Sequence, residues 1–171
     1  MAFPTLFKDI AISPDSDDFF IETLEFHHSS FSSPERIVHQ PKDYTLTLEA
    51  TAPVDPSTAV NFTACPFDIR RPNKDNKGQQ EVSIIIPNVD RRLTAQMDRA
   101  RGNGGPITCY WRTYAFSQQN APILNPPPRF EIRNGQITVF EVQLQAVFFD
   151  FLNDKFPGKI YTSEFAPGLT R

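Results

Sequence analysis

The chain contains few of the residues that build disulfide frameworks, metal clusters or nucleotide-binding loops. Among its 171 residues are two cysteines, three histidines and one tryptophan. Without a Cys-x-x-Cys pair, a disulfide scaffold and the common zinc sites are disfavoured, and we expect Cys65 and Cys109 to be thiols. Glycines do not form a Walker loop or a dinucleotide fingerprint. The sequence therefore predicts no cofactor.

Long apolar runs and an excess of positive charge are also lacking. No segment approaches the ~20 apolar residues of a membrane span, and Lys8 and Asp9 stand where a signal peptide would have its apolar core. The formal net charge is −3, and the arginines near residues 91–101 are diluted by Asp90 and Asp98. We therefore expect synthesis in a cytoplasm and neither a membrane nor a specific nucleic acid as partner.

Phenylalanine and proline are abundant instead, with 16 of each. Phenylalanine supplies a large apolar area per residue. Proline limits helix content and fills long connections and sheet edges. Together they predict a single mainly β domain with elaborate loops and adhesive surfaces.

Apolar residues alternate with polar ones over most of the chain, with the period of half-buried strands. The apolar residues switch between even-numbered and odd-numbered positions after Cys65-Pro66 and again at Val139-Phe140. This change of strand face predicts a bulge or bend at both places. Long bulged strands are typical of a small β-barrel or sandwich. The predicted strand segments are 18–28, 44–50, 60–64, 67–69, 82–86, 107–116, 130–133 and 136–148.

One α-helix is predicted over about residues 88–101, flanking the sheet. Asn88 is placed to cap its N-terminus, and Gly102 to end it as a C′ glycine. Its apolar stripe consists of Val89, Leu93, Met97 and Ala100.

A tight turn is predicted at Asn134-Gly135, a dipeptide typical of two-residue type I′ hairpins. In that register Ile132 would face Ile137, and Phe130 would face Val139.

Residues able to carry chemistry are scattered, and we assign no catalytic, cofactor-binding or metal-binding residue. His27 and His28 are adjacent in a strand and point to opposite faces, so a metal site shared with His39 is disfavoured. The cysteines lie in strand patterns, where a buried thiol is more common than a nucleophile. The carboxylates weighed as acid–base pairs, Asp17, Asp18, Glu22 and Glu25, are expected on solvated faces with nothing to perturb them.

Much of the aromatic content falls in the terminal segments. We divide the chain into an N-terminal arm (1–17), a β-domain (18–148) and an extended C-terminal segment (149–171). The arm either caps its own core or clips onto a neighbour. Because interfaces favour Phe and Tyr, we expect the terminal segments to contact neighbouring subunits. The candidate interface residues are Phe3, Leu6, Phe7, Phe149, Phe151, Phe156, Tyr161 and Phe165.

The order of these elements resembles a family of short minor tail proteins from long-tailed bacteriophages, of the distal-tail or hub type. The resemblance covers most of the chain from about residue 20. It is carried by the strand ending Ile84-Ile85-Ile86-Pro87-Asn88, the helix through Arg101, the strand Thr108-Cys109-Tyr110-Trp111, the hairpin at Asn134-Gly135, and the motifs Phe156-Pro157-Gly158 and Phe165-Ala166-Pro167-Gly168-Leu169.

This resemblance implies a tail-tube-like β-barrel or sandwich that forms a homo-oligomeric ring, a trimer or a hexamer, in the tail tip of the virion. Its other partners would be tail proteins, namely the tube, the hub and the central tip protein, and DNA would pass through the lumen. Longer hub proteins carry a cysteine-rich iron–sulfur domain that this sequence lacks, so no cluster is implied.

Two other functions are consistent with a mainly β domain. Trp111, Tyr110 and Tyr114 could form a stacking platform in a module that binds carbohydrate or a host surface. An enzyme of an unrecognised β class would need a pocket with converging titratable groups.

Overall fold

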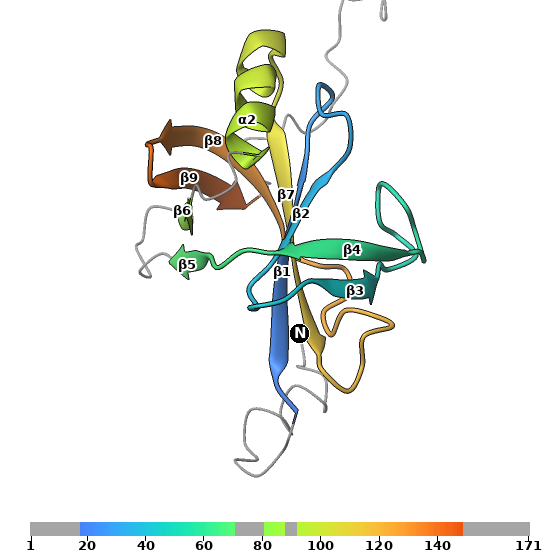
Figure 1. The fold of residues 1–171 in the computed structure, drawn as a ribbon. Coiled ribbons are helices and arrows are strands. Elements are labelled where there is room, and N and C mark those ends of the chain that lie inside the picture. The colour runs from blue at the N-terminus through green and yellow to red at the C-terminus, as the bar shows by residue number, and fades with distance from the viewer. Residues whose placement is uncertain (1–17, 71–80, 88–91, 149–171) are drawn as a thin grey trace, which may run out of the picture.

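The computed structural model describes residues 18–70, 81–87 and 92–148, which form one mainly β domain with one helix (Figure 1). This confirms the predicted fold class. In chain order the elements are β1 (Phe20–His27), β2 (Glu35–Val38), β3 (Tyr44–Thr47), β4 (Ala59–Ala64), β5 (Asp68–Arg70), β6 (Glu81–Pro87), α2 (Arg92–Asn103), β7 (Ile107–Ala115), β8 (Arg129–Ile137) and β9 (Glu141–Phe148).

The nine strands form one open sheet in the order β3-β4-β2-β1-β7-β8-β9-β6-β5. All neighbouring pairs run antiparallel except β2 and β4, which are parallel. The central strands β1 and β7 pair over eight positions, from Phe20 opposite Ala115 to His27 opposite Thr108. In Figure 1, β3 and β4 extend to one side of these strands and β8 and β9 to the other.

A first hydrophobic core lies on the face of the sheet that α2 covers. Leu24 and Phe26 of β1 are fully buried there, together with Cys109 of β7. The helix contributes Leu93 and Met97 to this core, as its predicted stripe requires. The buried side chains of β8, β9, β6 and β5 pack in this same cluster. This half of the sheet therefore curls around the face that α2 covers.

A second hydrophobic core lies on the opposite face of the same central strands. Ile21 of β1 and Tyr114 of β7 are fully buried here, with Leu46 of β3 and Phe62 of β4. Successive residues of a strand point to opposite faces, so β1 and β7 form a wall shared by both cores. The two ends of the sheet therefore curl toward opposite faces.

The change of parity near Pro66 has a topological cause. β4 pairs with β2 and β3, whereas β5, which starts only four residues after β4 ends, pairs with β6 at the other edge of the sheet. The chain thus leaves the second core, where Phe62 packs, and enters the first core at Phe67. The bend expected at this position is confirmed.

The helix ends two residues later than expected. Leu93, Met97 and Ala100 are buried as predicted, while the proposed N-terminal residues lie outside the described part. α2 continues through Gly102 to Asn103, and Gly104 adopts φ +65°. Gly104 is therefore the residue in left-handed conformation that follows the helix, and the assignment of Gly102 to this role is wrong.

The prediction of a hairpin turn at Asn134-Gly135 is wrong. β8 continues through both residues to Ile137, and the chain reverses at residues 138–141. There the Thr138 amide donates to the Glu141 carbonyl at 2.9 Å, and the Glu141 amide donates to Thr138 Oγ1 at 3.0 Å. The parity change at Val139-Phe140 thus marks the hairpin tip and not a bulge.

Close approach of two strands accounts for the glycine within β8. A Cβ atom built on Gly135 would lie 3.1 Å from Leu144 Cδ2 of β9, so a side chain here would displace its neighbour. The register shifts between Ile132 and Asn134, just before this contact. Because the chain reverses at residues 138–141, Ile132 lies opposite Ala146 and not opposite Ile137. No helix in the described residues is long and apolar enough to cross a membrane.

Candidate functional site

The most unusual group in the domain is a buried cluster of charges beside the second core. Arg112 of β7 is fully buried, with no exposed surface. Its guanidinium forms a bidentate pair with Glu49, with Nε 2.7 Å from Oε2 and Nη2 2.8 Å from Oε1. The remaining terminal nitrogen donates to Glu25 of β1, which is also fully buried. Arg112 is therefore held between the sheet and the segment that follows β3.

The cluster extends from the interior toward the surface. Arg36 of β2 contacts Glu25 Oε1 through Nε at 2.9 Å and Asp55 Oδ2 through Nη2 at 2.8 Å. His27 Nε2 lies 3.2 Å from Glu25 Oε1. The Tyr110 ring lies under the Arg112 guanidinium, 5.3 Å from Cζ to the ring centroid, and contributes a cation–π interaction. Glu25 thus accepts hydrogen bonds from Arg112 and Arg36, and the His27 ring lies beside the same carboxylate.

The surroundings of Glu25 keep it ionised. Burial by itself raises the pKa of this carboxyl, but His27 and the charges of Arg112 and Arg36 outweigh burial and lower the pKa to about 2. Burial disfavours the charge on Arg112, but the hydrogen bonds and charges of Glu49 and Glu25 raise its pKa. A general acid or base needs a pKa near the working pH. Glu25 and Arg112 are therefore suited to fix geometry and not to transfer protons.

Sequence reasoning missed this cluster, and the expectation that Glu25 lies on a solvated face is wrong. The sequence signal that could have revealed the cluster is the strand face on which each charged residue falls. Arg112 has the same parity as Tyr110 and Tyr114, and Glu25 has the same parity as Ile21, so both charges fall on strand faces that carry large or apolar side chains. A charge at such a position requires a buried partner.

The histidines and cysteines are used in separate local contacts. His28 Nε2 lies 3.1 Å from the Gly104 carbonyl, and His39 Nδ1 accepts the Phe67 amide at 3.0 Å. Both cysteines are thiols, as expected, and burial raises the pKa of Cys109. Within the described ranges, no three His, Cys, Asp or Glu side chains are grouped so that they could hold a metal ion.

The aromatic side chains of β7 do not form one stacking platform. Tyr114 is fully buried, and its hydroxyl donates to the Thr47 carbonyl at 3.1 Å. Burial raises the pKa of this tyrosine above its usual range. Trp111 lies on the other face of the strand from Tyr110 and Tyr114, where it stacks on Phe130 with 6.4 Å between ring centroids.

Apolar side chains are exposed at one end of the central strands. Phe19, just before β1, stacks on Phe116, just after β7, with 4.7 Å between centroids, and the two are 38% and 42% exposed. The Ser117 amide and hydroxyl donate to the Asp18 carboxylate. These hydrogen bonds outweigh the effect of burial and lower the pKa of Asp18, so the expectation that nothing perturbs it is wrong. We call Phe19 and Phe116 the stacked pair.

Two further apolar side chains are exposed at the tip of the β8–β9 hairpin. Val139 is 69% exposed and Phe140 is 85% exposed, the highest values among the large hydrophobic residues described. β8 runs antiparallel to β7 and continues to Ile137, beyond its pairing with Ile107, the first residue of β7. The hairpin tip therefore lies at the opposite end of the sheet from the stacked pair.

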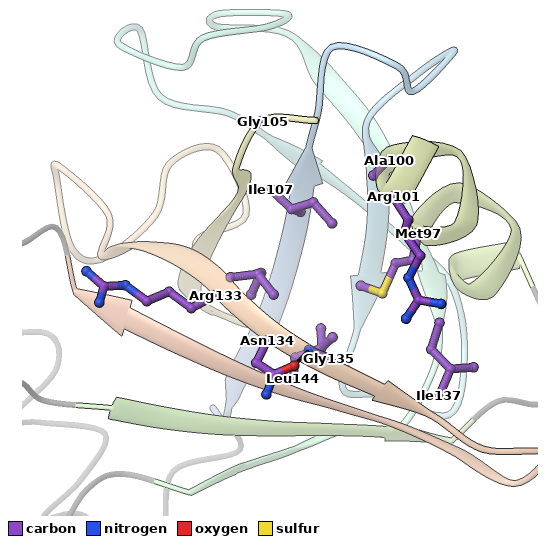
Figure 2. Close-up of a pocket in the computed structure, with 11 residues that line it drawn as sticks. Met97, Ala100, Arg101, Gly105, Ile107, Arg133, Asn134, Gly135, Ile137 and Leu144 are labelled. Atoms are coloured by element: carbon purple, nitrogen blue, oxygen red, sulfur yellow. Dashed lines mark hydrogen bonds between the residues drawn. The ribbon is translucent and has the colours of Figure 1, made fainter. Parts of the chain in front are cut away.

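An open cavity of about 160 Å³ lies between the C-terminal half of α2 and the strands β8 and β9 (Figure 2). In the figure Met97 and Ile107 point into it, and Arg101 reaches from the helix toward Ile137. The wall is polar and apolar in nearly equal parts and is completed by Ala100, Gly105, Ile132, Arg133, Asn134, Gly135 and Leu144. It is smaller than the roughly 300–1,000 Å³ of common small-molecule pockets.

The interface residues predicted in the terminal segments lie outside the described residues, so the structure places none of them. This applies to Phe3, Leu6, Phe7, Phe149, Phe151, Phe156, Tyr161 and Phe165.

Comparison with known proteins places this mainly β domain in a family. Residues 7–161 match the family described as a domain of unknown function (DUF1833), and the chain belongs to that family. No curated protein matched the sequence.

Proposed function

We propose that the chain is a structural component of a bacteriophage tail tip. It forms a homo-oligomeric ring, a trimer or a hexamer, that connects the tail tube to the hub or central tip protein of the virion. The resemblance in element order described above motivates this function. The mainly β architecture with one flanking helix is consistent with it.

The observation that carries the proposal is the exposure of large apolar side chains at both ends of the sheet. The stacked pair lies at one end, and Val139 and Phe140 lie at the other. A ring requires two different patches on each subunit, because each copy contacts its neighbours through unlike surfaces. Aromatic side chains are enriched at such contacts.

The buried cluster supports a structural role over a catalytic one. Its central carboxyl, Glu25, has a pKa of about 2, and Arg112 has its guanidinium paired with two carboxylates. Separating these partners would leave an uncompensated buried charge, so the cluster favours one arrangement of the strands that carry it. A subunit that must match identical neighbours around a ring requires a fixed geometry.

Immunogold labelling of phage particles produced from the source genome tests the proposal directly. Antibodies raised against the purified chain should label the tail tip and leave the head unlabelled. A chain that is absent from purified particles would refute the function. Labelling along the whole tail would show that the chain is a component of the tail tube and not of a ring at the tip.

The oligomeric state provides an independent measurement. Light scattering after size exclusion, over a wide concentration range, should reveal species of three or six times the 19.4 kDa chain mass. Removal of residues 1–17 tests the predicted arm, and a ring mass that collapses on this deletion assigns the arm to a neighbouring subunit.

A further inference from the structure

We infer that Phe140, at the tip of the β8–β9 hairpin, inserts into the cavity between α2 and β8 of a second copy of this chain. This inference rests on the ring proposed above and assigns one of its contacts. Phe140 supplies the inserted group, and the wall that receives it is formed by Met97, Ala100, Ile107, Ile132 and Leu144.

The size of the cavity fits a single aromatic ring. The cavity is open on one side and its volume is about 160 Å³. An enclosed apolar cavity of roughly 150 Å³ is known to hold benzene, so this volume suffices for one ring. A drug-sized ligand would need at least about twice that volume. Phe140 is the most exposed large hydrophobic side chain described, at 85%, so it does not fill the cavity of its own copy.

Charges around the tip and the cavity are complementary. Arg101 and Arg133 line the cavity and are both exposed. Glu141 directly follows Phe140 and is partly exposed. Insertion of the ring would bring this carboxylate to the basic rim of the neighbouring copy. Rim charges of opposite sign orient partners during association.

The contact is of the kind that a ring requires. The tip of one copy meets a different surface on the next, as each contact around a ring does. A protruding hairpin tip and a concave site can meet with little change in either backbone.

Photo-crosslinking tests which surface receives the tip. A benzophenone amino acid replaces Phe140 in the full-length chain, and chains labelled with light and heavy isotopes are mixed before irradiation. The expected products join position 140 of one isotope form to peptides containing Met97 or Ile107 of the other. Cross-links confined to one copy, including those to its own residues 149–171, would overturn the inference. Cross-links to another surface, or none at all, would overturn it as well.

Substitutions test the energetics of the same contact. Because burial of a phenylalanine side chain is lost, Phe140→Ser should raise the dissociation constant between copies by about 10- to 100-fold. Val54→Ser is the matched control, since Val54 is also an exposed apolar residue, at 37%, in a loop distant in sequence from the tip. Equal effects of the two variants would contradict insertion.

A charge exchange separates a specific contact from general adhesion. Arg101→Glu and Glu141→Arg should each weaken association by up to about fivefold, and the double variant should recover it. Failure of the double variant to recover association would count against the pairing.

These outcomes are distinguishable from failure of the proposed function. If the chain is absent from phage particles but cross-links through the cavity, the tail-tip function fails and the contact between copies stands. If rings form in particles but position 140 cross-links elsewhere, the ring stands and this contact fails.

Discussion

Replacing Glu25 with glutamine should destabilise the domain in a way that depends on pH. Glutamine preserves the shape of the side chain but removes the charge that Arg112 and Arg36 contact. The carboxyl has a pKa of about 2 in the folded state, below its ordinary value of 4.5. A depressed folded-state pKa contributes stability above pH 4.5, and this contribution is lost as the pH falls through about 2.

The magnitude follows from the size of this shift. Each pKa unit corresponds to about 1.4 kcal/mol, so ionised Glu25 contributes about 3 kcal/mol at pH 7. At pH 3 the same linkage leaves about 1 kcal/mol, because the carboxyl is by then mostly protonated in the unfolded chain. The stability difference between the native chain and Glu25→Gln should therefore shrink by about 2 kcal/mol between these pH values.

Urea unfolding monitored by circular dichroism at both pH values measures this difference. Glu22→Gln serves as the control, because Glu22 lies on the same strand three residues earlier and faces the other side of the sheet. The control should show no comparable dependence on pH. A destabilisation by Glu25→Gln that is equal at the two pH values, or below about 1 kcal/mol at pH 7, would refute the assignment of Glu25 as the ionised centre of the cluster.

Three further outcomes are expected. Arg112→Met should cost about 3–5 kcal/mol in urea unfolding, because it leaves two buried carboxylates without their shared cation; a loss below 1 kcal/mol would mean that the cluster is not buried in solution. Gly135→Val should cost about 1–3 kcal/mol through its clash with Leu144, and the same substitution should cost less when it is made in a Leu144→Ala background; an unchanged melting temperature for Gly135→Val would rule out the close approach. A thiol reagent should modify Cys65 in the native protein and reach Cys109 only in denaturant, since Cys109 is fully buried and its pKa is raised; equal rates for both would contradict the core assignment.

The spacing of apolar residues predicted most of the strands and the helix, because one buried face of each element determines that spacing. The alternation in residues 44–48 and 82–86 places the same side chains inward in the structure, and the helix buries Leu93 and Met97 as its stripe indicated. In each case one face of the element is buried, and the spacing of apolar residues in the sequence indicates which face that is.

Long-range packing decided the features that were missed. The Asn134-Gly135 dipeptide favours a tight turn locally, but Leu144 on β9 needs the space that Gly135 leaves, so the strand continues to the true reversal at Thr138. Tertiary contact here outweighs turn propensity.

The candidate sites were missed for a related reason. Glu25, Glu49 and Arg112 are separated by 24 and 63 residues, so their pairing depends on a topology that periodicity does not determine. Val139 and Phe140 were predicted to lie within a strand because both residue types are common in strands and in cores. Their composition therefore gave no sign that the chain reverses there and exposes them.

The shared wall formed by β1 and β7 has a consequence for synthesis on the ribosome. Thr108 follows its partner His27 by 81 residues, and Ala115 follows Phe20 by 95. At roughly 5–20 residues per second, β1 waits about 4–19 s for its partner strand, with apolar side chains on both of its faces. During that interval the strand is exposed to pairing with other nascent chains. A chaperone that binds the first 100 residues would therefore improve the yield of folded protein more than one that acts after release.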